Sequence, residues 1–221
     1  MKVYREISGP SKAPQLDCVA FYKYDGSNFR AEWHKKRGWD KFGTRRTMIP
    51  LGDEKWGDMI NVFMRTYSED LAKIFTDDKD LKKREQFTVY GEYFGPNSFA
   101  GWHDPNDKER EIVIFDINVH KKGTILPRDF IKTFGHLKIP DVVYEGNFSK
   151  QFIQDVWDGK YVEGEGVVVK GVNPKTKKAQ HGLWMAKCKT QKWMNELKSR
   201  AETNPDTFGR TLDDNAREQT V

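Results

Sequence analysis

Short runs of alternating polar and apolar residues recur along the chain. Residues 28–34, Asn-Phe-Arg-Ala-Glu-Trp-His, are the clearest of them, and a period of two indicates a strand with one buried face. β-branched and aromatic side chains strengthen this signal in other segments. Together these patterns predict strands at 19–25, 28–34, 39–44, 87–94, 111–120, 141–144, 165–170 and 183–189.

Apolar residues spaced three and four apart predict the helices. The longest prediction covers 54–76, with Asp53 as the expected N-cap and Asp77-Asp78 at the expected end. Shorter helices are predicted at 128–134, after the cap residue Ser149, and around Trp193. We assign to the core the apolar stripe of the longest helix, which consists of Ile60, Phe63, Met64, Tyr67, Leu71, Ile74 and Phe75.

The length of 221 residues suffices for one domain with a sizeable core. We expect this domain to cover 1–200. Residues 1–18 contain Gly9-Pro10 and Pro14, and the sequence predicts a loose lead-in to the first strand there. Residues 201–221 are polar and have little to bury, which predicts a disordered or loosely docked tail and no separate C-terminal domain.

The charge of the chain is unevenly distributed. The net charge is +5, with +8 on residues 1–200 and −3 on residues 201–221. This suits a body that binds a polyanion, although well-charged surfaces are common in soluble proteins. Cys18 and Cys188 form neither a disulfide framework nor a metal cluster. No apolar run is long enough for a signal peptide or a membrane span, so we expect a cytoplasmic, intracellular protein with no membrane partner.

Candidate chemistry begins at Lys23-Tyr24-Asp25-Gly26. Lys23 and Asp25, two apart on a strand, point to the same face, and Gly26 permits a turn or a close approach. A lysine can act as a covalent nucleophile where burial and neighbouring positive charge lower its pKa. An exposed Lys-Asp pair beside a hairpin turn is the simpler alternative. Further along, Arg45 and Arg46 can bind phosphate in bidentate fashion or be solvated at a strand end.

Five motifs in a fixed order decide between these alternatives. The chain resembles the covalent nucleotidyltransferases, the superfamily of polynucleotide ligases and mRNA capping enzymes, from residue 23 to residue 189. The motifs that carry the resemblance are Lys-x-Asp-Gly at Lys23, Gly-Glu at Glu92, Phe115-Asp116, Glu-Gly-Val-Val-Val-Lys from Glu165 to Lys170, and Lys-x-Lys at Lys187 and Lys189.

Within this superfamily the chain most resembles the phage-type RNA ligases that seal nicks. Asn28 stands where DNA ligases typically carry an arginine, and Gly91-Glu92-Tyr93-Phe94-Gly95 is similar to the RNA-ligase form of its motif. Only 32 residues follow Lys189, too few for the extra domain of these relatives, and their Arg-x-Asp-Lys motif is missing. The list of expected partners therefore includes an accessory domain or protein that acts in trans.

The resemblance implies a role for each matching residue. Lys23 attacks the α-phosphate of ATP, while Lys187, Lys189 and a divalent metal favour its neutral amine. Glu92 hydrogen-bonds the ribose, Phe115 stacks on adenine, Glu165 binds Mg²⁺ or Mn²⁺, and Arg45 or Arg46 holds the 5′-phosphate of a nick. Tyr22, Asp25 and Asn28 support the nucleotide pocket. Lys170 lies, by strand alternation, on the opposite face from Glu165.

The resulting prediction is an α+β protein of the nucleotidyltransferase, ATP-grasp-like fold, with mainly antiparallel sheets, flanking helices and a central nucleotide cleft. The implied function is an ATP-dependent, nick-sealing RNA ligase that acts on RNA-containing ends of a nicked duplex, as a monomer, in a cell or in the host cytoplasm of a phage. A minimal ATP-dependent DNA ligase, a capping guanylyltransferase and a non-sealing module that binds nucleic-acid ends are the alternatives.

Overall fold

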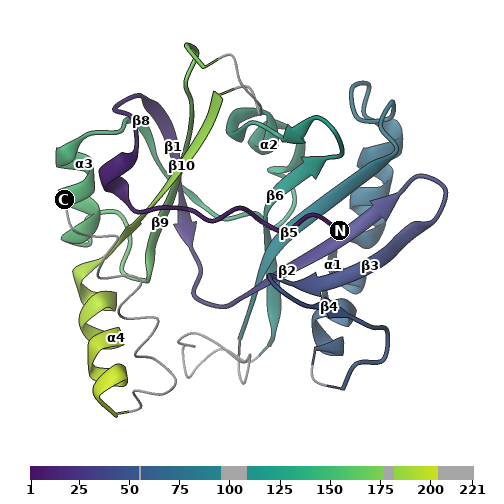
Figure 1. The fold of residues 1–221 in the computed structure, drawn as a ribbon, viewed down its shortest axis with the longest axis horizontal. Coiled ribbons are helices and arrows are strands. Elements are labelled where there is room, and N and C mark those ends of the chain that lie inside the picture. The colour runs from purple at the N-terminus through teal and green to yellow at the C-terminus, as the bar shows by residue number, and fades with distance from the viewer. Residues whose placement is uncertain (55, 96–108, 177–181, 204–221) are drawn as a thin grey trace. The chain divides into compact units, whose positions relative to one another are not determined.

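The computed structural model describes residues 1–54, 56–95, 109–176 and 182–203. The chain divides into two compact units, each with its own sheet (Figure 1). The first unit holds Met1–Arg5, Asp25–Ile125 and Asp129–Ile139, and the second holds Glu6–Tyr24, Leu126–Arg128 and Pro140–Val221. In the described part of the chain, no helix is both long and apolar enough to cross a membrane.

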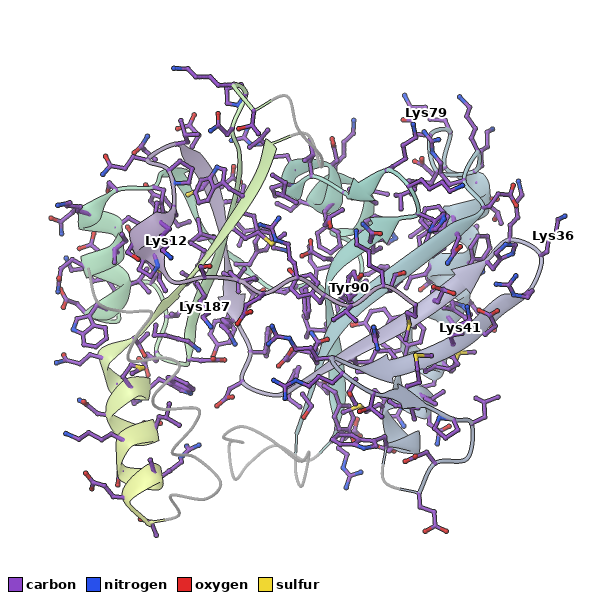
Figure 2. The ribbon with its side chains drawn as sticks, in the orientation of Figure 1. Lys12, Lys36, Lys41, Lys79, Tyr90 and Lys187 are labelled. Atoms are coloured by element: carbon purple, nitrogen blue, oxygen red, sulfur yellow. The ribbon has the colours of Figure 1, made fainter. Side chains whose placement is uncertain are left out.

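The first unit is built on a six-stranded antiparallel sheet in the order β4-β3-β2-β5-β6-β7. Figure 2 shows Lys41 on one of these strands and Lys36 in the turn before it. The predicted strands of this region are all present. The bounds are β2 (Ser27–His34), β3 (Gly38–Thr44), β4 (Met48–Ile49), β5 (Gln86–Phe94), β6 (Glu111–Val119) and β7 (Gly123–Thr124).

Helix α1 (Gly57–Asp77) covers one face of this sheet and, with α2 (Pro127–Phe134), closes its core. Alternate residues of the strands meet the helix, so that Phe29 of β2 lies 5.2 Å from Phe63 of α1 between ring centroids. The buried residues at this interface include the following side chains from both layers: Ala31, Trp33, Phe42, Tyr67, Leu71, Phe75, Phe87, Val89, Ile112, Ile114, Phe130 and Phe134.

Two details of the predicted helix 54–76 are wrong. The helix begins at Gly57, not at 54, because the Asp53 carboxylate accepts a hydrogen bond from the Trp56 amide at 2.7 Å and closes a turn ahead of the helix. Met64 was assigned to the core stripe, but its side chain is 38% exposed. The predicted end at Asp77-Asp78 is confirmed, since Asp77 is the last helical residue.

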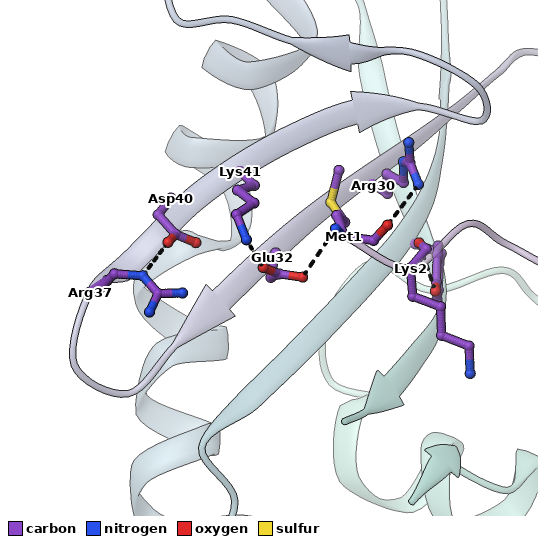
Figure 3. A network of polar contacts seen from close by, with 8 residues as sticks. Met1, Lys2, Arg30, Glu32, Arg37, Asp40 and Lys41 are labelled. Carbon is purple, nitrogen blue, oxygen red and sulfur yellow. Dashed lines mark hydrogen bonds and ion pairs between the residues drawn. The ribbon is translucent and has the colours of Figure 1, made fainter. Parts of the chain in front are cut away.

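The first five residues pack on the first unit's sheet instead of leading loosely into a strand. The Arg30 guanidinium donates to the Met1 carbonyl at 3.3 Å, and the Met1 amine lies 3.9 Å from Glu32 (Figure 3). Lys41 donates to the other carboxylate oxygen of Glu32 at 2.8 Å. Arg30 and Glu32 are both buried, and these charged contacts therefore replace the water that each group loses.

Tyr4 extends this contact along the same sheet. Its hydroxyl donates a hydrogen bond to Asp116, which is buried. The Tyr4 ring lies 4.9 Å from Tyr90 and 5.0 Å from Phe115, the latter edge to face. Glycine and proline patterns carry no information about such contacts, which explains why the sequence predicted a loose segment.

The second unit has a four-stranded antiparallel sheet in the order β10-β9-β1-β8. Helix α3 (Lys150–Trp157) begins after Ser149, whose hydroxyl accepts from the Phe152 amide at 3.1 Å and confirms the predicted cap. The other elements are η1 (Pro10–Lys12), β1 (Asp17–Lys23), β8 (Val142–Asn147), β9 (Gly166–Val172), β10 (Leu183–Lys189) and α4 (Gln191–Thr203). Helix α4 continues past residue 201 to Thr203, while the rest of the predicted tail, 204–221, lies outside the described residues.

The two faces of this second sheet differ in character. One face packs against α3 and buries Cys18, Ala20, Val167, Val169, Trp184, Ala186 and Cys188. Cys188 therefore packs on the face opposite to its two lysine neighbours, as the alternation predicted, and burial raises its pKa to about 12. The other face, called the lysine face below, consists of Val19, Phe21, Lys23, Gly166, Val168, Lys170, Met185, Lys187 and Lys189.

Candidate active site

Strand register brings Lys23 and Lys189 to opposite sides of Gly166. Lys23 is the last residue of β1 and pairs with Gly166 of β9, and Lys189, the last residue of β10, pairs with the same glycine. Directly paired residues of antiparallel strands point to the same face. Two cations that are 166 positions apart in the sequence therefore meet across one strand.

Glu165 lies between the two ammonium groups. Lys23 Nζ donates to Glu165 Oε2 at 2.5 Å, and Lys189 Nζ donates to Oε1 of the same carboxylate. Glu165 is 5% exposed and Lys189 is 3% exposed, whereas Lys23 is 23% exposed. The most accessible member of the triad is thus the amine that the sequence identified as the nucleophile.

The backbone of Gly166 makes this arrangement possible. Its φ is +144°, and a β-carbon at this position would lie 2.0 Å from the carbonyl oxygen of Cys188. Because that conformation interrupts the strand's alternation, the preceding residue, Glu165, directs its carboxylate to the lysine face. Thr190 holds the same corner: its amide donates to the Glu165 carbonyl at 3.2 Å and its hydroxyl to the Gly164 carbonyl at 2.7 Å.

Burial and the charges of the triad shift the pKa values of both buried groups. Burial, together with the neighbouring charges of Lys23 and Lys187, lowers the pKa of Lys189 to about 8 against the attraction of Glu165. Burial alone raises the pKa of Glu165, but the nearby ammonium groups of Lys189 and Lys23 outweigh it and hold that pKa below its ordinary value. The carboxylate is therefore ionised and shared by two cations.

Trp193 and Lys187 complete the surroundings of Lys189. The Lys189 ammonium lies 4.1 Å from the centroid of the Trp193 ring, at the start of α4, a cation–π contact that partly replaces lost hydration. The Thr190 hydroxyl accepts from the Trp193 amide at 3.2 Å and so fixes this first turn. Lys187, labelled in Figure 2, is partly exposed and lies on the lysine face opposite Val168.

The structure corrects the predicted place of Lys170. Alternation counted from Glu165 put it on the opposite face, but Gly166 breaks that count. Lys170 belongs to the lysine face, where it pairs with Val19 and Met185. It is 3% exposed, and its ammonium lies 4.8 Å from the centroid of the Phe21 ring.

The predicted pairing of Lys23 with Asp25 on one strand face is also wrong. β1 ends at Lys23, so Asp25 lies beyond the strand, in the part of the chain assigned to the first unit. Gly26 does allow the close approach that was expected, because a β-carbon there would lie 2.4 Å from the Tyr93 carbonyl oxygen. Tyr22 belongs to the second unit, where its hydroxyl would lie 2.1 Å from a β-carbon placed on Gly164.

The remaining candidates gather at one end of the first unit's sheet. Asn28 of β2 pairs with Glu92 of β5, and both are partly buried. The buried Oδ1 atom of Asn28 has no hydrogen-bond partner within the described part of the chain. Arg45 and Arg46 are exposed in the turn between β3 and β4, next to Thr44, which pairs with Phe29 at this same end.

Phe115 lies at a β-bulge of this sheet. The register of β5 and β6 shifts between Tyr90, which pairs with Asp116, and Gly91, which pairs with Ile114. Phe115 is the extra residue of the bulge and stays partly exposed. Bulges re-aim side chains and are frequent beside active sites. Tyr4, which contacts this ring, had no sequence signal that could have marked it.

Metal binding was predicted at Glu165 alone. Among the described residues, no three or more His, Cys, Asp or Glu side chains lie together in a way that could hold a metal ion. One carboxylate nevertheless suits Mg²⁺ or Mn²⁺, which proteins usually bind through one or two carboxylates together with phosphate oxygens and water. The Glu165 carboxylate fits that role only if it gives up a lysine contact.

Comparisons with known proteins specify the family. The family model described as RNA ligase matches residues 17–189. The chain therefore belongs to the RNA ligase family. No curated protein matches it in sequence.

Solved structures of RNA ligase from Naegleria gruberi share the fold. The structure with PPi has a TM-score of 0.63 at 14% identity, and the match covers 93% of this chain and 58% of the ligase chain. A mutant with ATP and Mn has a TM-score of 0.59 at 14% identity, with 86% and 56% covered. A further mutant with AMP and Mn scores 0.60 at 14% identity over the same shares. The chain thus spans less than three fifths of these proteins.

Proposed function

We propose that this protein is an ATP-dependent RNA ligase that uses Lys23 as its covalent nucleophile. The observation that carries the proposal is the triad of Lys23, Glu165 and Lys189, because it combines an accessible primary amine with a buried, charged setting. Membership of the RNA ligase family and the likeness to ligase structures solved with ATP, AMP, PPi and Mn support it.

The proposed reaction has three steps. Lys23 Nζ attacks the α-phosphorus of ATP, the bond to the β-phosphate oxygen breaks, and pyrophosphate leaves as the amine loses its protons. The AMP moiety then passes to the 5′-phosphate of a nucleic acid, which frees Lys23. A 3′-hydroxyl attacks this activated phosphate, forms the phosphodiester bond and releases AMP.

The lysine face supplies most of the electrostatics for the first step. A nucleophilic amine must be neutral, and neighbouring cations favour that form, whereas a carboxylate opposes it. Lys189 and Lys187 are the cationic neighbours, and Glu165 is the opposing carboxylate. A divalent metal held by Glu165 would supply positive charge at the phosphates. We therefore propose that Glu165 exchanges its contact with Lys23 for this role when the nucleotide binds.

We propose nucleoside- and end-binding roles for residues of the first unit, as the family resemblance implies. Glu92 and Asn28 are paired across β5 and β2, and the Asn28 Oδ1 atom, which has no hydrogen-bond partner among the described residues, suits a ligand donor such as a ribose hydroxyl. Phe115 at its bulge suits stacking on adenine. Arg45 or Arg46, exposed near the same end of the sheet, suits the 5′-phosphate of the nick. Tyr22 and Asp25 are kept as supporting residues of the nucleotide pocket.

Labelling with ATP tests the proposal directly. Incubation with ATP radiolabelled at the α-phosphate and with Mg²⁺ should leave label on the protein, and Lys23→Ala should abolish it. Lys12→Ala, which removes an exposed lysine of the second unit, is the control and should label normally. An unlabelled wild-type protein would refute the adenylation proposal, and label from GTP instead of ATP would indicate a guanylyltransferase.

A nick-sealing panel then tests the substrate. RNA or DNA is placed on each side of a 5′-phosphorylated nick, and we expect sealing when the 3′-hydroxyl strand is RNA. Preferential sealing of DNA would assign the chain to the DNA ligases. Label without sealing would indicate either an end-binding module or the need for an accessory domain in trans, which addition of such a domain distinguishes.

A further inference from the structure

Three turns of the first unit come together at the end of its sheet opposite to Asn28 and Glu92. With the strand residues that flank them, these turns are residues 34–40 between β2 and β3, 78–86 leading into β5, and 120–123 between β6 and β7. We call them the basic end. The Lys35 amide donates to the Glu85 carbonyl at 2.9 Å, and the Lys35 ammonium donates to the Lys82 carbonyl at 3.1 Å. The His120 amide donates to the Gln86 carbonyl at 3.0 Å.

The basic end holds the whole charge excess of the protein. Its twenty residues contain nine Lys and Arg against four Asp and Glu, a net of +5. The other 201 residues contain 29 basic and 29 acidic residues and are neutral in sum. Three segments far apart in the sequence thus combine their charge at one place, and a composition average over the chain conceals this.

These basic side chains are available to a partner. Eight of the nine are exposed, and Arg84 is partly so. Figure 2 shows Lys36 and Lys79 projecting outward from this end. Arg37 is held in an ion pair with Asp40, but exposed pairs of this kind are weak and exchange readily.

The basic end is separate from the candidate site residues of the same unit. Along β2, Asn28 and His34 are six residues apart, which corresponds to about 20 Å at a rise of about 3.4 Å per residue. Arg45 and Arg46, the predicted ligands of the 5′-phosphate, lie at the Asn28 end. A group bound at the basic end is therefore too distant to take part in the chemistry at Glu92 or Asn28.

We propose that the basic end binds the phosphate backbone of a nucleic-acid duplex at a distance from the joined ends. The residues suit this partner because lysines on three turns present several separated charges, as a backbone contact without sequence recognition requires. A membrane surface is a poorer fit, since the large hydrophobic side chains exposed in the described residues are Val3, Met48, Leu51, Met64 and Val142, all outside these turns. The inference goes beyond the adenylation chemistry and does not require sealing.

The test compares two charge-matched triple variants. Lys36→Gln, Lys83→Gln and Lys121→Gln remove one cation from each turn. Lys12→Gln, Lys132→Gln and Lys150→Gln remove three exposed lysines elsewhere. Binding to a nicked RNA duplex is measured by fluorescence anisotropy without ATP, in salt from 50 to 300 mM by design, roughly the range over which backbone contacts are salt-sensitive.

The first variant should bind at least about tenfold more weakly at low salt, and its plot of log affinity against log salt should be less steep by about two to three. The control should retain the wild-type affinity within about threefold. Equal losses of duplex affinity in both variants, or no loss in the first variant, would overturn the proposal. It would also be overturned if the first variant kept its duplex affinity but no longer bound anionic vesicles.

Two further measurements keep the result interpretable. Lys83→Gln alone should make the plot of log affinity against log salt less steep by about one. This single variant tests the proposal even if the triple variant does not fold. Self-adenylation with ATP is measured in parallel. Wild-type protein that binds duplex through the basic end but takes no label would refute the proposed ligase activity and leave this inference standing.

Discussion

The ammonium of Lys23 lies 2.5 Å from a carboxylate oxygen of Glu165, and the other oxygen of that carboxylate accepts from Lys189. One anion therefore balances two cations on the lysine face. Removing the anion would leave a buried ammonium at Lys189 with no counter-charge, whereas removing Lys23 would leave one balanced pair. Loss of the Glu165 carboxylate should therefore disturb the triad more than loss of Lys23.

Replacement of Glu165 by glutamine should show this sensitivity. Gln keeps the shape but removes the charge, so the free energy of unfolding should fall by about 3 kcal/mol, the usual cost of an uncompensated buried charge. Protein labelling by ATP should fall at least a hundredfold in rate, a size typical for loss of a charged catalytic group. Urea denaturation and a labelling time course measure the two effects.

Glu163→Gln is the matched control, because Glu163 is 91% exposed and lies 3.9 Å from Lys192. It should change neither stability nor labelling. If Glu165→Gln labels at the wild-type rate, the carboxylate has no part in the reaction and the proposed exchange between lysine and metal is wrong.

A second prediction concerns the backbone at Gly166. Gly166→Ala places a β-carbon 2.0 Å from the Cys188 carbonyl oxygen at a φ of +144°. We expect the free energy of unfolding to fall by about 3 kcal/mol or more, since both the backbone conformation and the contact are unfavourable. The strand end must also move, so labelling should be lost in the protein that still folds.

Gly159→Ala separates these causes. Gly159 also has a positive φ of +76°, but among the described residues the nearest atom to its β-carbon would be the Val162 carbonyl oxygen at 3.6 Å. The expected cost is therefore only about 1 kcal/mol, from the backbone conformation alone, with normal labelling. Equal costs for the two substitutions in urea denaturation would show that the approach to Cys188 is unimportant.

The sequence predicted every strand except the two-residue strands β4 and β7, because alternation is a local pattern, and the order of the motifs singled out the lysines of the candidate site. Lys187 and Lys189 alternate with the packed Cys188, so the face that these two lysines share follows from a period of two. That Lys23 lies on the same face depends on the pairing of β1 and β10 with β9, which no local pattern gives. The position of Glu165 could not be predicted in this way. It depends on a positive φ at Gly166, which interrupts the count, so that Glu165 reaches the face that Lys170 already shares with Gly166 by regular alternation.

Contacts between distant segments were equally out of reach. Tyr4 reaches Phe115 and Asp116, but nothing in the first eighteen residues distinguishes it from an ordinary exposed tyrosine. The basic end shows the same limit at a larger scale, because Lys36, Lys83 and Lys121 belong to turns that are unremarkable one by one. Their combined charge exists only once the sheet is paired.

The role of Phe115 leads to a third prediction. If the ring stacks on adenine, Phe115→Ala should raise the KM for ATP in the labelling reaction about fivefold, because such a contact contributes about 1 kcal/mol. The maximal rate should change little, since the ring does not touch the reacting phosphorus. Phe115→Tyr keeps an aromatic face and should restore the KM. A loss of maximal rate with unchanged KM in Phe115→Ala would assign the residue to another role.

The last prediction concerns acid stability and Glu32 of the first unit. Burial alone raises the pKa of Glu32, but hydrogen bonds from Lys41 and Gln86 and the Met1 amine outweigh it and hold the pKa below its ordinary value of 4.5. A carboxylate with a depressed folded-state pKa contributes its full stability above the unfolded value and loses it as the pH falls through the folded value. Glu32→Gln should therefore lower the free energy of unfolding by about 2 kcal/mol at neutral pH, and the difference from wild type should narrow progressively below pH 4.5.

Urea denaturation at several pH values measures this difference, with Glu69→Gln on the exposed face of α1 as the control that should show none. A gap that stays constant down to pH 3 would mean that Glu32 acts through packing and not through its charge.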